Sequence, residues 1–299
     1  MKKQYRTHRS KCILQEPVTR TGATGAGFGS AQPVHRFISC HPQNHSFGFL
    51  SLEAVRRFLA ESVELGVKEY YFTGGEPFLH PEMVEILEET LRLGPATVLT
   101  NATVFRKPLV EKLRRVAAAS RFSLEFRVSI DGPDPESNDP IRGEGTFEEA
   151  LRGTGLLAAA GFLPILTAVQ TWEDRDTPAR LRAFERAMRE AGCARPRVKI
   201  IPTLRIGMEE IRAGGYGEDV RVSEEMLEGY DQDQLICSHS RIVTDRGVAV
   251  CPILIEAPGA HLGVTLKEAS RPFRIGHAVC STCYRHGAIC SNPGSSSLE

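Results

Sequence analysis

The chain has 299 residues, of which 41% are hydrophobic and 25% are charged, and its 37 basic and 37 acidic side chains give a formal net charge of zero. This composition is typical of a water-soluble globular protein. Because the charges balance, the sequence has no excess of basic residues of the kind that binds nucleic acid or an anionic membrane. No apolar run approaches the roughly 20 residues that cross a bilayer, and no apolar segment follows the basic residues 1–6, so we expect a cytoplasmic protein without a signal peptide.

The hydrophobic pattern divides the chain into an irregular start and a regular body. Residues 1–47 lack periodicity and include a Gly-rich stretch at 21–30, which predicts an atypical, loop-rich segment. From Ser51, which can cap a helix, strand and helix patterns alternate. We expect helices near 51–63, 81–91, 107–118, 146–160 and 178–192, and strands near 68–73, 96–100, 123–130, 163–170 and 197–202.

This alternation predicts an α/β fold with a parallel sheet and right-handed crossovers. Five visible strands are too few for a complete eight-stranded barrel and suit a partial one over residues 48–210. From about residue 223 the pattern changes to an acidic helix, a hairpin at 241–251 with its turn at 245–247, and a Cys-rich end. We therefore divide the remainder into a Cys-rich region at 211–291 and a flexible tail at 292–299.

Polar residues follow three successive strands. The first strand ends in Gly74-Gly75-Glu76-Pro77, the second in Thr100-Asn101 and the third in Ser129-Ile130-Asp131-Gly132. Each motif alone is also typical of an ordinary turn. Because the carboxyl ends of parallel strands meet at one edge of a sheet, we expect these motifs to converge on one ligand site.

Five of the eight cysteines lie in the last 63 residues. In a reducing compartment such clustering favours metal binding over disulfides. A hairpin with a cysteine near each end and a later Cys-x-x-Cys can bring four thiolates to one point, which suits either zinc or a 4Fe–4S cluster. The first choice of ligands is Cys237, Cys251, Cys280 and Cys283, with Cys290 as a substitute.

The order of these motifs resembles the radical S-adenosylmethionine (radical SAM) family over about residues 50–210. The resemblance rests on the strand-end motifs and on an Asp139-x-x-Arg142-Gly143 segment followed by Phe147. It implies a partial (β/α)6 TIM-like barrel. It also implies that the Gly-Gly-Glu-Pro turn binds the amino group of SAM and that Arg142 pairs with its carboxylate. The implied SAM-binding residues are Gly74, Gly75, Glu76, Pro77, Thr100, Asn101, Ser129, Asp131 and Arg142.

The resemblance further implies a function. Family members cleave SAM reductively at a 4Fe–4S cluster and so start radical chemistry on a substrate, here a peptide or a small metabolite. An electron donor such as a flavodoxin or ferredoxin is implied, and neither nucleic acid nor a membrane is expected as a partner. The C-terminal cysteines resemble a SPASM or twitch extension, which implies one auxiliary 4Fe–4S cluster.

One family feature is absent from this sequence. The family holds its SAM-cleaving cluster with Cys-x-x-x-Cys-x-x-Cys, whereas the corresponding window at 35–41 contains only Cys40, and Cys12 lies 28 residues earlier. Cys40 is kept as a candidate metal ligand, and no catalytic residue can be named. Two explanations stay open: an inactive binding or scaffold member, or a reading-frame or sequence error up to about residue 40, with the true sequence resuming near Phe37. A zinc-stabilised α/β protein of other chemistry is a third alternative.

Overall fold

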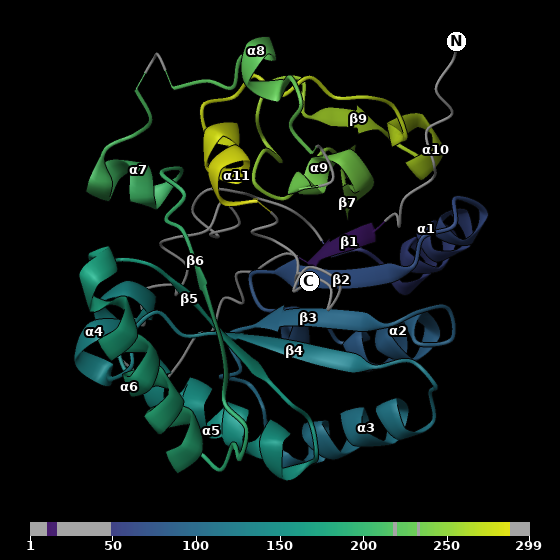
Figure 1. Ribbon diagram of the computed structural model, residues 1–299. Helices are drawn as coiled ribbons and strands as arrows, with labels where there is room; N and C mark the ends of the chain where they lie inside the picture. The colour runs from purple at the N-terminus through teal and green to yellow at the C-terminus, as the bar shows by residue number, and fades with distance from the viewer. Residues whose placement is uncertain (1–10, 17–48, 218–219, 232–233, 288–299) are drawn as a thin grey trace, which may run out of the picture.

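The computed structural model describes residues 11–16, 49–217, 220–231 and 234–287, and the fold is built on a nine-stranded sheet in the order β6-β5-β4-β3-β2-β1-β7-β8-β9 (Figure 1). Strands β1 to β6 pair in parallel. Their bounds are Lys11–Glu16, Glu69–Gly74, Ala96–Thr100, Leu124–Ser129, Ile165–Val169 and Arg197–Ile201. Within the described residues β6 pairs only with β5, so the parallel part forms an open, partial barrel, as the sequence predicts.

Six helices follow or connect these strands and lie on the outer side of the sheet (Figure 1). They are α1 Leu52–Glu64, α2 Met83–Thr90, α3 Lys107–Ala118, α4 Pro135–Arg142, α5 Thr146–Ala159 and α6 Thr177–Glu190. The Ser51 hydroxyl accepts a hydrogen bond from Ala54 N at 3.2 Å, which confirms the predicted cap of α1. All five predicted helices and five predicted strands are present, with ends that shift by only a few residues.

Two elements differ from the sequence-based expectation. The segment predicted to be loop-rich contains strand β1, which pairs in parallel with β2 on one side and with β7 on the other. Six residues carry no distinctive local pattern, so partners distant in sequence define this strand. Helix α4 was not expected either, because Pro140 lies inside it and its apolar positions are few.

Alternation along the strands separates the two faces of the sheet. Tyr70 and Phe72 of β2 pack into the main core beneath the helices, while Tyr71 between them belongs to a separate inner cluster. That inner cluster also contains Ile242 and Ala249 from the C-terminal strands. The C-terminal region therefore packs against the inner side of the barrel wall near β2.

The C-terminal region continues the same sheet beyond β1. Strands β7 Ser240–Thr244 and β8 Gly247–Ala249 are antiparallel, which confirms the predicted hairpin, and β9 His261–Gly263 pairs with β8. The short helices are α7 Met208–Ala213, α8 Glu224–Leu227, α9 Ile236–His239, α10 Leu266–Ala269 and α11 Cys280–His286. Figure 1 shows this region gathered at one end of the molecule, beyond β1.

None of the helices in the described parts of the chain is both long and apolar enough to cross a bilayer.

A close approach between α5 and the end of β3 yields a stability prediction. A Cβ added at Gly153 would lie 2.1 Å from the carbonyl oxygen of Ala102, whose own φ is +58°. Gly153→Ala is expected to lower the free energy of unfolding by about 1–3 kcal/mol, because backbone must move to admit the methyl group. Urea denaturation measures the effect. Gly276→Ala is the control, since no atom other than those of the glycine and its chain neighbours lies within 4 Å of that Cβ position. Equal stabilities of the two variants would contradict the prediction.

Candidate functional site

Glu76 joins the ends of β2 and β3. Its side chain is buried, and Oε1 accepts hydrogen bonds from Phe78 N at 3.1 Å and Thr100 Oγ1 at 2.7 Å. Oε2 accepts from Asn101 N at 2.7 Å. The first two predicted strand-end motifs therefore meet through this one carboxylate. Gly74, Gly75 and Pro77 are buried beside it.

Thr100 and Asn101 also shape the turn after β3. Thr100 Oγ1 accepts from Ala102 N at 2.9 Å, and Asn101 Oδ1 accepts from the backbone N and hydroxyl of Thr103 at 3.0 and 2.8 Å. These side-chain bonds to nearby backbone are typical of Asx and Ser/Thr turns. The turn-forming and site-forming interpretations of this motif are thus compatible.

The environment of Glu76 predicts a pH dependence of stability. Burial raises its pKa from 4.5 to about 7, against the opposing effect of the hydrogen bonds from Asn101, Thr100 and Phe78. Because the folded chain then holds this proton more tightly than the unfolded chain, its stabilising contribution is complete below pH 4.5 and is lost as the pH rises to about 7. The loss is at most about 3 kcal/mol. Urea denaturation at several pH values should show a shallower slope for Glu76→Gln; an unchanged slope would contradict the prediction.

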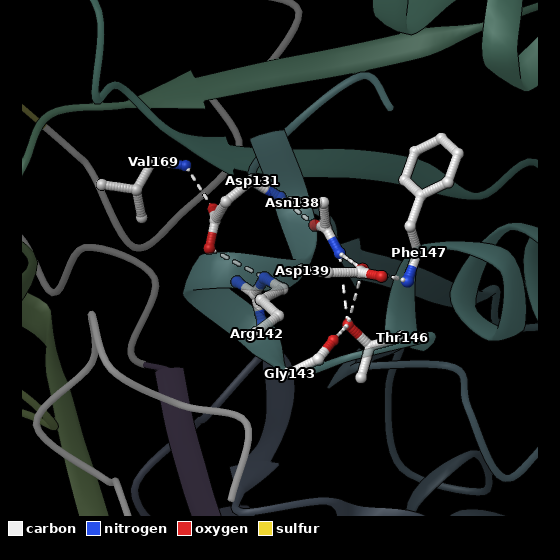
Figure 2. Close-up of polar contacts among 8 residues, drawn as sticks. All are labelled: Asp131, Asn138, Asp139, Arg142, Gly143, Thr146, Phe147 and Val169. Carbon is white, nitrogen blue, oxygen red and sulfur yellow. Dashed lines mark hydrogen bonds and ion pairs between the residues drawn. The ribbon is translucent and has the colours of Figure 1, made fainter. Parts of the chain in front are cut away.

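Asp131 and Arg142 form a buried ion pair beyond the end of β4 (Figure 2). Asp131 Oδ2 lies 2.7 Å from Arg142 Nε, and the side chains are 1% and 5% exposed. Asp131 Oδ1 accepts from Val169 N at 2.8 Å, and Asp131 N donates to Asn138 Oδ1 at 3.0 Å. The pair thereby connects the ends of β4 and β5 to α4. Ser129, the last residue of β4, is half-buried two residues before Asp131.

The ion pair leaves hydrogen-bonding capacity on Arg142. Arg142 Nε lies at ion-pair distance from Asp131, but its N–H does not point at the carboxylate oxygen well enough to form a hydrogen bond. Arg142 Nη1 is also buried, with no hydrogen-bond partner among the described residues. An unsatisfied buried guanidinium donor is costly. A ligand carboxylate would satisfy it in the bidentate geometry that arginine favours, so this side chain fits the role that the resemblance implies.

Part of the Asp139-x-x-Arg142-Gly143 motif serves to begin α5. Asp139 accepts a hydrogen bond from Gly145 N at 2.8 Å. It also accepts one from Phe147 N at 3.0 Å (Figure 2). Thr146 donates its hydroxyl to Gly143 O at 2.7 Å and accepts from Asn138 Nδ2 at 3.2 Å. A carboxylate at this helix N-terminus is favourable for backbone satisfaction and for the helix dipole. The network fixes α4 and α5 relative to each other and so holds Arg142 in place.

Four of the predicted metal ligands line one cavity of about 20 Å³. Cys237 comes from α9, Cys251 follows β8, and Cys280 and Cys283 come from α11. The remaining lining residues are apolar: Leu235, Ile236, Ile253, Leu254, Phe273, Ile275 and Val279. Cys290 and Cys40 lie outside the described residues.

The four cysteines share a cavity but do not close around a single ion in the structure. In the described segments no three His, Cys, Asp or Glu side chains are close enough to hold a single metal ion, as tetrahedral zinc with Zn–S bonds of about 2.3 Å would require. Four cysteine thiolates are a ligand set that both a structural zinc ion and a 4Fe–4S cluster use.

Arg241 beside this cavity was not identified from the sequence. Its Nη1 donates to Cys237 O at 2.7 Å, and burial lowers its pKa, while the nearby thiols of Cys237 and Cys251 act in the opposite direction. Burial raises the pKa of the Cys280 thiol, because it too disfavours the charged form, and backbone hydrogen bonds from His277 and Gly276 oppose this rise. A buried cation and backbone donors near sulfur stabilise thiolates.

Arg127 on the inner barrel wall was also missed. It is buried, and its guanidinium lies 5.5 Å from the ring centroid of Tyr71, whose hydroxyl donates to Glu69 Oε2 at 3.1 Å. Burial raises the pKa of Tyr71, and Arg127 opposes that rise. The inward position of Arg127 can be predicted from the alternation along its strand only when the strand registers are known.

Comparisons with known proteins agree with this geometry. The family model "Radical SAM superfamily" matches residues 31–184, just over half of the chain. AdoMet-dependent heme synthase of Methanosarcina barkeri (strain Fusaro / DSM 804) is 37% identical over 117 residues, which are 38% of this chain and 32% of that protein. The curated relative is thus matched over about a third of its own length.

Two solved structures share the fold. Native anSMEcpe with bound AdoMet superposes with a TM-score of 0.59 at 17% identity, covering 87% of this chain and 80% of that one. Streptococcus suis SuiB bound to precursor peptide SuiA gives a TM-score of 0.56 at 11% identity, covering 89% and 65%. With its partial parallel barrel, its converging strand-end motifs and the family match over more than half its length, this chain belongs to the radical SAM superfamily.

Proposed function

We propose that this chain binds SAM at the carboxyl ends of β2 to β4 and holds one auxiliary 4Fe–4S cluster, as an enzyme that modifies a peptide or a small metabolite. The observation that carries the proposal is the cavity lined by Cys237, Cys251, Cys280 and Cys283, in the region that continues the sheet of the strand-end motifs. Both substrate classes occur among its relatives, since one is a heme synthase and another binds a precursor peptide.

The SAM site would use backbone and charge together. Gly74 and Gly75 leave backbone open to the amino group, and the Glu76 carboxylate fixes the turn against Thr100 and Asn101. Arg142 would receive the SAM carboxylate on its unsatisfied donors. Asp131 holds Arg142 in place, and Ser129 lies on the same strand end toward the ribose, as the resemblance implies.

The auxiliary cluster would be held by four thiolates. Such a cluster, when bound, supplies one-electron chemistry, and hydrogen bonds and burial set its potential. This chain contributes the apolar enclosure, the Arg241 cation and the backbone donors before Cys280. A flavodoxin or ferredoxin would serve as electron donor, and we place the protein in the cytoplasm.

The residues before α1 do not fit the SAM-cleaving cluster of the family. Three thiolates are needed, and residues 1–51 contain two cysteines, of which Cys12 belongs to strand β1. We therefore derive no cleavage step from this sequence. This misfit favours a second candidate function, a catalytically inactive member that keeps the SAM pocket and the auxiliary cluster.

Spectroscopy and SAM binding separate the two functions. We expect Arg142→Lys to weaken SAM binding by about tenfold or more in isothermal titration calorimetry, because lysine keeps the charge but loses the bidentate fork. Arg175→Gln, at a side chain 78% exposed, is the control. About eight irons per chain with 5′-deoxyadenosine formation would establish the enzyme. About four irons without that product would establish the inactive member, and no SAM binding would overturn the proposed site.

A further inference from the structure

The hydroxyl of Tyr216 connects the barrel to the cysteine helix. It accepts a hydrogen bond from Arg205 N at 3.2 Å, in the segment that leaves β6, and it lies 2.7 Å from Thr282 Oγ1. Thr282 stands in α11 between Cys280 and Cys283. One side chain in the loop after α7 thus bridges two segments that are 77 positions apart in the sequence.

The barrel end of this bridge continues to the candidate SAM site. Thr203 donates its hydroxyl to Gln170 O, and Gln170 N donates to Ile201 O at 2.8 Å. The preceding residue, Val169, donates its backbone N–H to Asp131, the partner of Arg142. Hydrogen bonds and short backbone steps therefore run from Arg142 along the ends of β4, β5 and β6 to α11.

We propose that Tyr216 is a positioning residue that couples SAM binding at Arg142 to the arrangement of Cys280 and Cys283. The inference rests on the proposed function. When the SAM carboxylate binds Arg142, the ion pair between Arg142 and Asp131 moves. Because the end of β5 is bonded to Asp131 and the end of β6 to β5, both strand ends move with it. Tyr216 transmits this displacement to α11. Thermodynamic linkage makes the effect reciprocal, so occupancy of the cysteine site alters SAM affinity by the same factor.

The geometry singles out Tyr216 rather than tyrosine contacts with α11 in general. Tyr230 also bonds this helix, since its hydroxyl donates to Tyr284 O at 3.0 Å and its ring stacks on Tyr284 at 4.5 Å between centroids. Tyr284 in turn donates to Met226 O at 2.8 Å. These contacts stay within the C-terminal region and do not reach the strand ends, which makes Tyr230 a matched control.

The test uses the full, metal-free chain with SAM as the ligand. Iodoacetamide labels the cysteines, mass spectrometry reads the rate at each, and calorimetry on the same samples gives the SAM dissociation constant. Cys193, buried at the end of α6, is the internal reference. In the unsubstituted protein SAM should change the labelling rates of Cys280 and Cys283 by about fivefold or more, the lower end of usual coupling energies.

Tyr216→Phe removes the hydroxyl, and Thr282→Val removes the final link while leaving the bond from Arg205 N. Both should still bind SAM but reduce its effect on Cys280 and Cys283 to less than about twofold, whereas Tyr230→Phe should retain it. SAM binding without an effect on these cysteines, or a full effect in Tyr216→Phe, overturns the coupling alone. Absence of SAM binding in the unsubstituted protein, both metal-free and after anaerobic reconstitution with iron and sulfide, overturns the proposed function and the coupling with it.

Discussion

Replacement of Asp131 with asparagine should lower the free energy of unfolding by about 3–5 kcal/mol, among the largest single-residue effects in this chain. Asp131 and Arg142 are 1% and 5% exposed, and their charges compensate one another at 2.7 Å. Asparagine leaves the guanidinium buried without a counter-charge and presents an amide donor toward another donor. Urea denaturation monitored by circular dichroism measures the loss.

Two further variants make this prediction specific. Asp131→Asn combined with Arg142→Met should recover much of the lost stability, because removal of both charges of a buried pair is often neutral. Glu173→Gln, which breaks the exposed pair with Arg175 at 70% and 78% exposure, should change stability by less than about 1 kcal/mol. If Asp131→Asn behaved like Glu173→Gln, the pair would not be the structural link described for the ends of β4 and β5.

The second large effect concerns iron content. Cys280→Ala is expected to remove about four irons and four sulfides per chain after anaerobic reconstitution, because a cluster with four protein ligands is lost when one ligand is deleted. Cys280 is 7% exposed and lines the shared cavity, so no solvent-exposed residue can easily replace it. Iron and sulfide analysis and the visible absorption of the cluster measure the change.

The cysteines themselves provide the controls for this experiment. Cys193→Ala should keep its iron, since that residue is buried at the end of α6 and does not line the cavity. Cys290→Ala should also keep it if the ligands are the four cavity cysteines. Iron lost on substitution of Cys290 but retained in Cys237→Ala would mean that the ligand set is assigned incorrectly.

Much of the fold was predictable because local signals and tertiary structure agree. Helix α3 was predicted at 107–118 and begins and ends there, with Pro108 in its first turn and Val110 and Leu113 on its buried face. Three strand-end motifs were expected to converge, and the first two do meet, because Glu76 contacts Thr100 and Asn101. The four cysteines were predicted to be ligands of one metal centre; in the structure they line one cavity, but no three of the described candidate ligands lie within reach of a single ion.

The remaining features depend on contacts that no local pattern encodes. Strand β1 exists through pairing with β2 and β7, which lie far from it in the sequence. The hydrogen bond between Tyr216 and Thr282 joins residues 66 positions apart. The proximity of Arg241 to Cys237 depends on the fold of the α9–β7 corner. Strand pairing and the contact between Tyr216 and Thr282 follow from topology, and the short-range contact of Arg241 follows from the local chain path, whereas sequence periodicity reports only which face of an element is buried.

The most direct test of the central claim is a metal analysis of the anaerobically reconstituted chain. The account predicts at least about four irons and four sulfides per chain that are absent from Cys280→Ala and retained in Cys193→Ala. One zinc per chain, with no sulfide, would contradict it, because a single tetrahedral ion would then occupy the cysteines assigned to an auxiliary iron–sulfur cluster.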